Sequence, residues 1–330
     1  MTLSQFIFKV KFRLWGRLVD FSEKKWFYLY LYRSYWHYKF SANKSVKNTT
    51  CYYTARPNPG AGIGHQLANW LTGHWYANIF GLKFAHIPLT PNWEDFFELG
   101  KDEIKVEDLI KEGYKLRKLP SVNERNPHDL ILNKAIIQSY AGKKLVLIAE
   151  QDQNTEDFGE IELLKQKYYQ AKARNNERLL YRKDQFNIAC HVRRGDIVGK
   201  KDDGMQMRWQ NQDYFVNVLK SVLNNLDNRK STSIYLFSQG EQQDFSEFEQ
   251  FPNLHFCLDM NVRDSFSHLI YADLLITSKS SFSYKPALIS NAVKVCPKSF
   301  WHGYPNTVKW VVADDNGAFD ENQLKQALSN

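Results

Sequence analysis

The most informative stretch of this sequence is HVRRGD at positions 191–196, which directly follows a short apolar segment. Residues 186–192 have the length and the apolar content of a buried strand that ends in charged residues. In open α/β sheets, ligands bind at the edge where the parallel strands end. Arg193 and Arg194 would there place two forked, permanent positive charges against phosphate oxygens. The alternative is a solvated turn that carries a basic pair.

Composition and charge exclude several classes of protein. The chain has 330 residues, which suffice for two domains, and its hydrophobic content of 43% is that of a globular protein. The net charge is +8, but residues 1–40 hold eight Lys and Arg against two acids, so the remainder is close to neutral. We therefore do not expect a nucleic-acid-binding protein, whose basic charge would cover a larger part of the chain.

The cysteines and the apolar segments bear on the compartment. Cys51, Cys190, Cys257 and Cys296 are far apart and form no CxxC pair, so we expect buried free thiols rather than a disulfide framework or a zinc site. The sequence has no uncharged apolar run of about 18 residues and no pattern of a secretory signal. These features predict a cytoplasmic protein.

Residues 1–40 are basic and rich in aromatic residues, and residues 41–50 are polar and predict a linker. Aromatic rings with cationic neighbours suit the headgroup layer of a membrane. Anionic lipid attracts each nearby Lys or Arg by roughly 1 kcal/mol. The alternative is one or two helices that pack on the protein's own core, and both interpretations can hold together. We expect a peripheral contact with the inner face of the cytoplasmic membrane as one partner of this segment.

A glycine-rich loop follows the first predicted strand. Gly60, Gly62 and Gly64 come after residues 51–54, and a helix with an apolar face then runs to Gly81. A strand, a glycine loop and a helix place backbone N–H groups against an anion at the start of the helix. The spacing departs from the dinucleotide fingerprint, because a further glycine and an acid after the second strand, residues 83–88, are missing. A structural tight turn is the alternative.

The second half of the chain alternates between strand and helix patterns. Strands are predicted over residues 186–192, 233–238, 254–258, 273–277 and 292–296, with polar residues where several of them end. This alternation predicts a doubly wound parallel sheet. We place a domain boundary near residue 182, which gives an extension at 1–50, a Rossmann-like acceptor-side domain at 51–182 and a Rossmann-like nucleotide-binding domain at 183–330. The order of elements in residues 91–145 stays open.

Three separated motifs together resemble those of the fucosyltransferase superfamily that contains α-1,2-, α-1,6- and protein O-fucosyltransferases. They are GAGIGHQL at positions 60–67, HVRRGD at 191–196, and ADLLITSKSSF at 272–282. The resemblance covers residues 51–300 and implies a GT-B architecture of the α/β class, with two Rossmann-like domains facing a cleft. It also implies GDP-fucose as the donor and inverting transfer without a metal or other cofactor. The sequence contains no Asp-x-Asp motif, the usual metal-binding motif of the other main glycosyltransferase fold.

The resemblance also implies roles for single residues. Arg193 is the candidate that contacts the β-phosphate of the donor and stabilises the negative charge on departing GDP, and Arg194 either shares this role or holds the loop through a carboxylate. His191 would lie near the nucleotide, and Asp264 would accept guanine N–H groups. The contacts to the diphosphate and the sugar phosphate are assigned to Gly62, Gly64, Ser280 and Ser281.

The base that takes the proton of the acceptor hydroxyl has several candidates. Asp196 is preferred because it lies within the arginine motif, although it is also suited to pair with Arg194. Asp202, Asp203 and Glu241 are the alternatives.

The function predicted from these motifs is transfer of L-fucose from GDP-fucose to a glycan hydroxyl, in a bacterial surface polysaccharide or a lipid-linked precursor. Two alternatives stay open. One is a transferase that uses another GDP-sugar, and the other is a non-catalytic module that binds a nucleotide or a glycan at a membrane.

Overall fold

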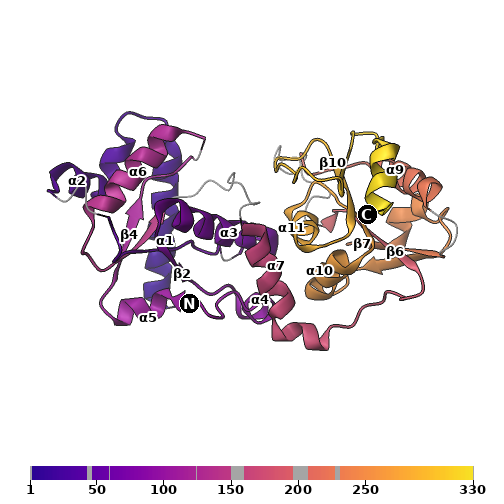
Figure 1. Ribbon diagram of the computed structural model, residues 1–330, viewed down its shortest axis with the longest axis horizontal. Helices are drawn as coiled ribbons and strands as arrows, with labels where there is room; N and C mark the ends of the chain where they lie inside the picture. The colour runs from indigo at the N-terminus through magenta and orange to yellow at the C-terminus, as the bar shows by residue number, and fades with distance from the viewer. Residues whose placement is uncertain are drawn as a thin grey trace. The chain divides into compact units, whose positions relative to one another are not determined.

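Two parallel β-sheets organise the chain (Figure 1). The computed structural model describes residues 2–42, 47–58, 60–123, 125–149, 160–195, 207–226 and 231–329. Contacts divide the chain into two compact units. Unit 1 comprises Met1–Pro59, Ala68–Leu89 and Leu99–Glu160, and unit 2 comprises Gly60–Leu67, Thr90–Glu98 and Ile161–Asn330.

The sheet of unit 1 has the strand order β3-β2-β1-β5-β4, and its strand pairs are parallel. Its strands are β1 Tyr52–Tyr53, β2 Lys83–His86, β3 Ile104–Lys105, β4 Lys115–Leu119 and β5 Leu145–Ala149. Its helices are α1 Leu3–Ser22, η1 Tyr28–Leu31, α2 Arg33–Phe40, α5 Val106–Lys111, α6 Pro127–Ser139 and the greater part of α3 Ile63–Phe80. Strand β5 lies between β1 and β4 in the sheet. Its five residues are all apolar, and all five are buried.

The sheet of unit 2 has the strand order β11-β10-β9-β6-β7-β8 and is also parallel. Its strands are β6 Phe186–His191, β7 Thr232–Ser238, β8 Leu254–Leu258, β9 Leu274–Ile276, β10 Val293–Pro297 and β11 Trp310–Ala313. Its helices are α4 Pro91–Phe97, α7 Ile161–Gln170, η3 Lys172–Asn176, α9 Gln212–Asn225, η5 Gln242–Phe248, α10 Val262–Tyr271, α11 Ser281–Ile289 and α12 Glu321–Ser329. Fully buried side chains such as Ile188, Phe215 and Leu236 form its core.

The connection between β8 and β9 creates a switch point in this sheet. The chain runs from β6 outward through β7 to β8, and then returns to the opposite side of β6 to form β9, β10 and β11. This is the strand order of a Rossmann fold, in which the ligand crevice lies where the two directions part. The loops that follow β6 and β9 therefore lie next to each other at the carboxyl edge of the sheet.

The predicted α/β class with two Rossmann-like parallel sheets is confirmed. Helix α3 contributes its beginning to unit 2 and residues 68–80 to unit 1. The domain boundary near residue 182 stays a prediction, because nothing in the structure tests whether the parts on either side fold independently.

The basic aromatic extension is folded onto unit 1. Tyr28 and Tyr35 are buried, and the Tyr28 hydroxyl donates a 3.0 Å hydrogen bond to the Ser121 hydroxyl. In the predicted linker, Asn48 is buried and its amide donates to the Ile137 carbonyl at 2.7 Å. Packing on the protein's own core, one of the two interpretations of this segment, therefore holds for the inner side of the extension. Among the described residues, no helix has both the length and the apolar composition that crossing a membrane requires.

Candidate functional site

The arginine motif and the serine-rich turn meet at the switch point of unit 2. Strands β6 and β9 are paired in the sheet, so the residues that follow them leave the same edge. One terminal nitrogen of Arg193 donates a 2.9 Å hydrogen bond to the hydroxyl of Ser280. The structure thus brings together two of the predicted site residues, from motifs that are far apart in the sequence.

Ser280 has a second role as the N-cap of helix α11. Its hydroxyl oxygen accepts a 3.2 Å hydrogen bond from the backbone N–H of Phe282. A serine hydroxyl has two acceptor sites and one donor hydrogen. Because Phe282 and Arg193 occupy both acceptor sites, the remaining capacity of this hydroxyl is its O–H donor. That donor, like the guanidinium beside it, suits a phosphate oxygen.

The beginnings of helices α3 and α11 touch at the same place. A Cβ atom added to Gly64 would lie only 2.6 Å from the backbone carbon and oxygen of Ser281, so this approach requires glycine. Gly62, which accepts hydrogen bonds from the N–H groups of His65 and Gln66, has no atom within 4 Å of its own added Cβ. Each helix carries a partial positive charge at its N-terminus, and the two together favour an anion.

His191 is buried at the end of β6 and is uncharged in the folded protein. Its Nδ1 is 2.8 Å from the Ser278 hydroxyl, and its ring is 5.4 Å from that of Phe282. Burial, with a smaller contribution from the charge of Arg193, lowers the pKa of His191 to about 3. A neutral imidazole here holds the Ser278 hydroxyl and thereby the serine-rich turn. It adds no positive charge to the carboxyl edge of the sheet.

Arg194 faces a different environment from its neighbour. It is buried, donates a 2.8 Å hydrogen bond to the Arg193 carbonyl, and stacks on the Trp209 ring with 4.1 Å between the guanidinium carbon and the ring centroid. Burial lowers the pKa of Arg194, and the negative charge of Glu247 partly offsets this effect. Its contacts fix the backbone that carries Arg193, while its predicted share in phosphate binding stays a prediction.

Two cations that the sequence motifs did not identify influence His65 at the beginning of α3. Lys285 is fully buried in α11, one helical turn beyond Ser281. Burial and the charges of Arg208 and Lys285 lower the pKa of His65, so both cations lie near the beginning of α3. The sequence offered one signal for Lys285, since it is a charged residue directly before the apolar residues 286–289.

The predicted carboxylates are placed in different ways. Asp264 is exposed in the first turn of α10, where its backbone carbonyl accepts from His268 Nδ1 at 2.7 Å. Glu241 forms a reciprocal capping pair with Asp244 at the start of η5. Asp196, the preferred base, and the alternatives Asp202 and Asp203 lie outside the described residues. The guanine-binding role of Asp264 and the identity of the base therefore stay predictions.

Comparisons with known proteins give structural neighbours only. No family model matches the chain, and neither does any curated protein. The apo form of POFUT1 aligns with a TM-score of 0.45 and 12% identity over 73% of this chain and 95% of its own. POFUT1 in complex with GDP-fucose aligns with a TM-score of 0.41 and 12% identity over 76% and 97%. The E. coli heptosyltransferase WaaC with ADP aligns with a TM-score of 0.39 and 11% identity over 84% and 98%.

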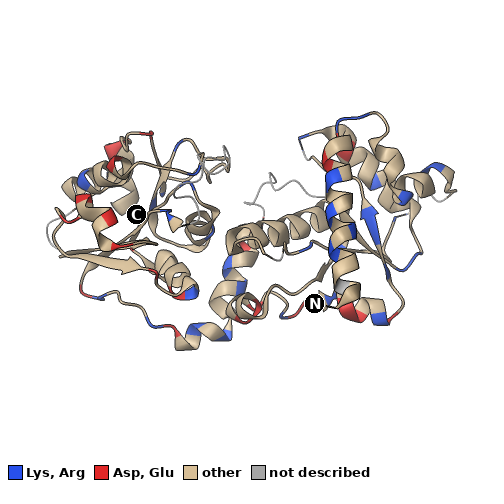
Figure 2. Ribbon diagram, turned by 180° about the vertical axis from the view of Figure 1, so that it is seen from behind, with Lys and Arg blue, Asp and Glu red and all other residues tan. Residues whose placement is uncertain are grey.

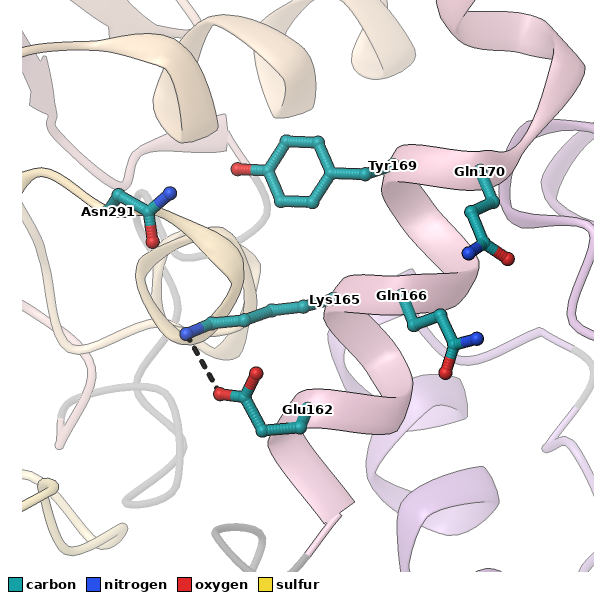
Figure 3. A pocket seen from close by; sticks show the side chains of 6 residues that line it. All are labelled: Glu162, Lys165, Gln166, Tyr169, Gln170 and Asn291. Carbon is teal, nitrogen blue, oxygen red and sulfur yellow. Dashed lines mark hydrogen bonds and ion pairs between the residues drawn. The ribbon is translucent and has the colours of Figure 1, made fainter.

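A separate polar pocket lies at the opposite edge of the unit 2 sheet. It has a volume of about 360 Å³ and is lined by Glu162, Lys165, Gln166, Tyr169, Gln170 and Asn291 (Figure 3). Asn291 precedes β10, whereas Arg193 and Ser280 follow β6 and β9, so the pocket is at the amino edge and the predicted site at the carboxyl edge. Figure 3 shows Lys165 turned toward Glu162, with which it forms a 3.1 Å ion pair. Within the described part of the chain, no group of three or more His, Cys, Asp and Glu is arranged to hold a metal ion.

Proposed function

We propose that this protein is an inverting glycosyltransferase that moves L-fucose from GDP-fucose to a hydroxyl of a glycan. The observation that carries the proposal is the Arg193–Ser280 hydrogen bond at the switch point of a Rossmann-type sheet. It is supported by Gly64, which packs on Ser281 beside this pair. Residues of all three motifs that resemble fucosyltransferases thus lie together in unit 2.

The charges at this edge fit the departure of a nucleoside diphosphate. In an inverting transfer, an acceptor oxygen forms a bond to the anomeric carbon while the bond from that carbon to the β-phosphate oxygen breaks. The electron pair leaves with GDP, whose negative charge grows. Arg193 and the N-termini of α3 and α11 stabilise that charge without reorganising, because the fold already holds them in place.

The acceptor hydroxyl must also lose its proton. Asp196 is the proposed base, since it lies three residues after Arg193 in the sequence of the arginine motif. The acceptor proposed here is a bacterial surface polysaccharide or its lipid-linked precursor, modified on the cytoplasmic side. The reaction proposed needs no metal.

Release of GDP tests the proposal directly. The full chain is incubated with GDP-fucose, GDP-mannose or a UDP-sugar and a panel of glycan acceptors, with and without EDTA. We expect acceptor-dependent GDP release from GDP-fucose, unchanged by EDTA and absent with UDP-sugars. Turnover with GDP-mannose alone would identify a different donor. Tight GDP binding without turnover on any acceptor would instead identify a non-catalytic binding module.

A further inference from the structure

Helix α1 has two apolar faces, and only one of them is used by the fold. On the inner face, the Trp15 ring packs edge-on against Tyr32 at 5.4 Å, and Lys118 lies 4.4 Å above it. Val19 on the same face is buried. This face accounts for the attachment of α1 to unit 1.

The outer face of α1 is a continuous apolar stripe that is open to solvent. Spacings of three and four residues place one set of side chains on a single side of the helix. Their exposed fractions range from 38% at Val10 to 75% at Leu3. The set, called the outer stripe below, is Leu3, Ile7, Val10, Leu14, Leu18 and Phe21. A stripe of this length on the surface of a protein marks a binding face.

Cations border the outer stripe on both sides. With 3.6 residues per turn, Arg13 and Arg17 lie along one side of the stripe and Lys11 along the other. Figure 2 shows Lys and Arg recurring along α1, whose first acid is Asp20. Lys11, Arg13 and Arg17 have no ion-pair partner among the residues that the structure describes.

The residues that follow α1 add exposed aromatic rings. Trp26 and Phe40 are each 83% exposed, and Tyr30 and Trp36 are 43% and 44% exposed. Neighbouring rings in this group are 5.4–6.1 Å apart, from Trp26 through Tyr30 and Trp36 to Phe40. Tryptophan and tyrosine favour the boundary between lipid headgroups and acyl chains.

We infer that the outer stripe of α1 docks in the surface of an anionic lipid bilayer, with α1 lying in the plane of the headgroups. Aliphatic side chains enter the acyl boundary, and the bordering cations contact lipid phosphates. A second copy of the chain fits this face less well. Two such stripes in contact would bring the bordering Lys and Arg side chains of both copies close together, and these like charges repel. A glycan fits the aromatic rings but not the aliphatic stripe.

The position of α1 on unit 1 gives the inference a consequence for the proposed function. Arg56, which follows β1, lies 5.4 Å from the Phe12 ring, and Lys118 is near the end of β4. The helix therefore lies beside the carboxyl edge of this sheet, in the domain that the sequence predicts to bind the acceptor. An acceptor carried on a lipid would be delivered to that edge. The docking itself rests on the surface of α1 and does not depend on the proposed reaction.

Flotation of the full chain with lipid vesicles tests the docking without any measurement of activity. The vesicles are phosphatidylcholine alone or phosphatidylcholine with phosphatidylglycerol, at low and high salt. We expect flotation with the anionic vesicles at low salt. The variant Ile7→Ser/Leu14→Ser/Leu18→Ser removes three exposed side chains of the stripe and should abolish flotation. Its matched control, Ile110→Ser/Leu116→Ser/Ile131→Ser, removes three similarly exposed side chains elsewhere on unit 1 and should float like the wild type.

A second pair of variants separates the charges from the stripe. Lys11→Gln/Arg13→Gln/Arg17→Gln should lower the vesicle partition coefficient about a hundredfold. The same three-charge change at the exposed Lys105, Lys134 and Lys143 should lower it much less. Unaltered thermal melting of each variant shows that it is folded. The inference would be overturned if the wild type did not float, or if the stripe variant floated as well as the wild type. It would also be overturned by a wild-type dimer that the stripe variant alone loses, or by binding to a polysaccharide without binding to vesicles.

Discussion

The guanidinium of Arg193 and the hydroxyl of Ser280 are joined by a 2.9 Å hydrogen bond across 87 positions of the chain. Because Ser280 also caps α11, this bond couples a cation to the N-terminus of a helix. The two sources of positive potential are therefore held in one arrangement before any ligand arrives, which is the condition for electrostatic stabilisation of a leaving group.

Arg193→Ala should lower kcat by a factor of about 10²–10³, which corresponds to roughly 3–4 kcal/mol of transition-state stabilisation. Arg193→Lys should recover little of the loss, because an ammonium group does not reproduce the two-pronged contact of a guanidinium. The measurement is the rate of GDP release at saturating donor. The control is Arg178→Ala, which removes an exposed arginine of the same unit. Near wild-type turnover of Arg193→Ala would rule out this leaving-group role.

Ser280→Ala should have two separable effects. Loss of the N-cap should reduce the free energy of unfolding by about 1 kcal/mol. Loss of the O–H donor and of the partner of Arg193 should also weaken GDP binding by several-fold. Asn126→Ala removes the N-cap of α6 in unit 1 and is the matched control for stability. Calorimetric titration with GDP should distinguish the two variants, and equal affinity in both would show that Ser280 acts only as a cap.

Gly64→Ala should destabilise the folded protein by about 1–3 kcal/mol, since its Cβ would meet the Ser281 backbone at 2.6 Å. Gly62→Ala adds a methyl group with no atom within 4 Å and should leave stability nearly unchanged. If Gly62 admits the sugar phosphate as predicted, its alanine variant should still bind GDP-fucose less tightly. Urea unfolding and donor titration together check both statements, and a Gly62 variant with wild-type affinity would remove Gly62 from the site.

The buried His191 should make the protein less stable at mildly acidic pH. Its pKa in the folded state, about 3, is below the ordinary value of 6.5, so only the unfolded chain gains this proton as the pH falls below 6.5. Above pH 6.5 the imidazole is neutral in both states, so the stability from the folded protein is fully present. As the pH falls from 6.5 toward 3, the free energy of unfolding decreases by up to about 1.4 kcal/mol for each pH unit. His191→Asn lacks this titration. Urea unfolding at pH 7.5, 6 and 5 should therefore show the wild type losing stability relative to the variant, whereas a constant difference would contradict the burial of a neutral imidazole.

The sequence predicted the parts of the fold whose signals are local. Residues 145–149 are uniformly apolar and form β5, and Gly81, with φ 65°, ends α3 as expected. The charged pattern of residues 161–181 is that of one helix, but α7 ends at Gln170 and η3 follows. Within residues 91–145, short elements such as β3, with two exposed residues, depend on pairing with a neighbouring strand and leave almost no pattern in the sequence.

For the site, the motifs identified which residues matter, but not how they are connected. Arg193 and Ser280 each followed a predicted strand, and their proximity depends on β6 pairing with β9 rather than with β8. Strand order is a long-range property, so no local pattern encodes it. Lys285 was missed for a related reason, because its proximity to His65 arises only when the beginnings of α3 and α11 meet.

Helix α3 begins in unit 2 and continues in unit 1, so the unit that contains Arg193 is not encoded by one uninterrupted stretch of gene. A fragment that starts at residue 183 would include β6 and α11 but would omit Gly64, which lies against Ser281. Under the proposed function, a chimera that exchanges the donor site therefore needs residues 60–67 together with the C-terminal half.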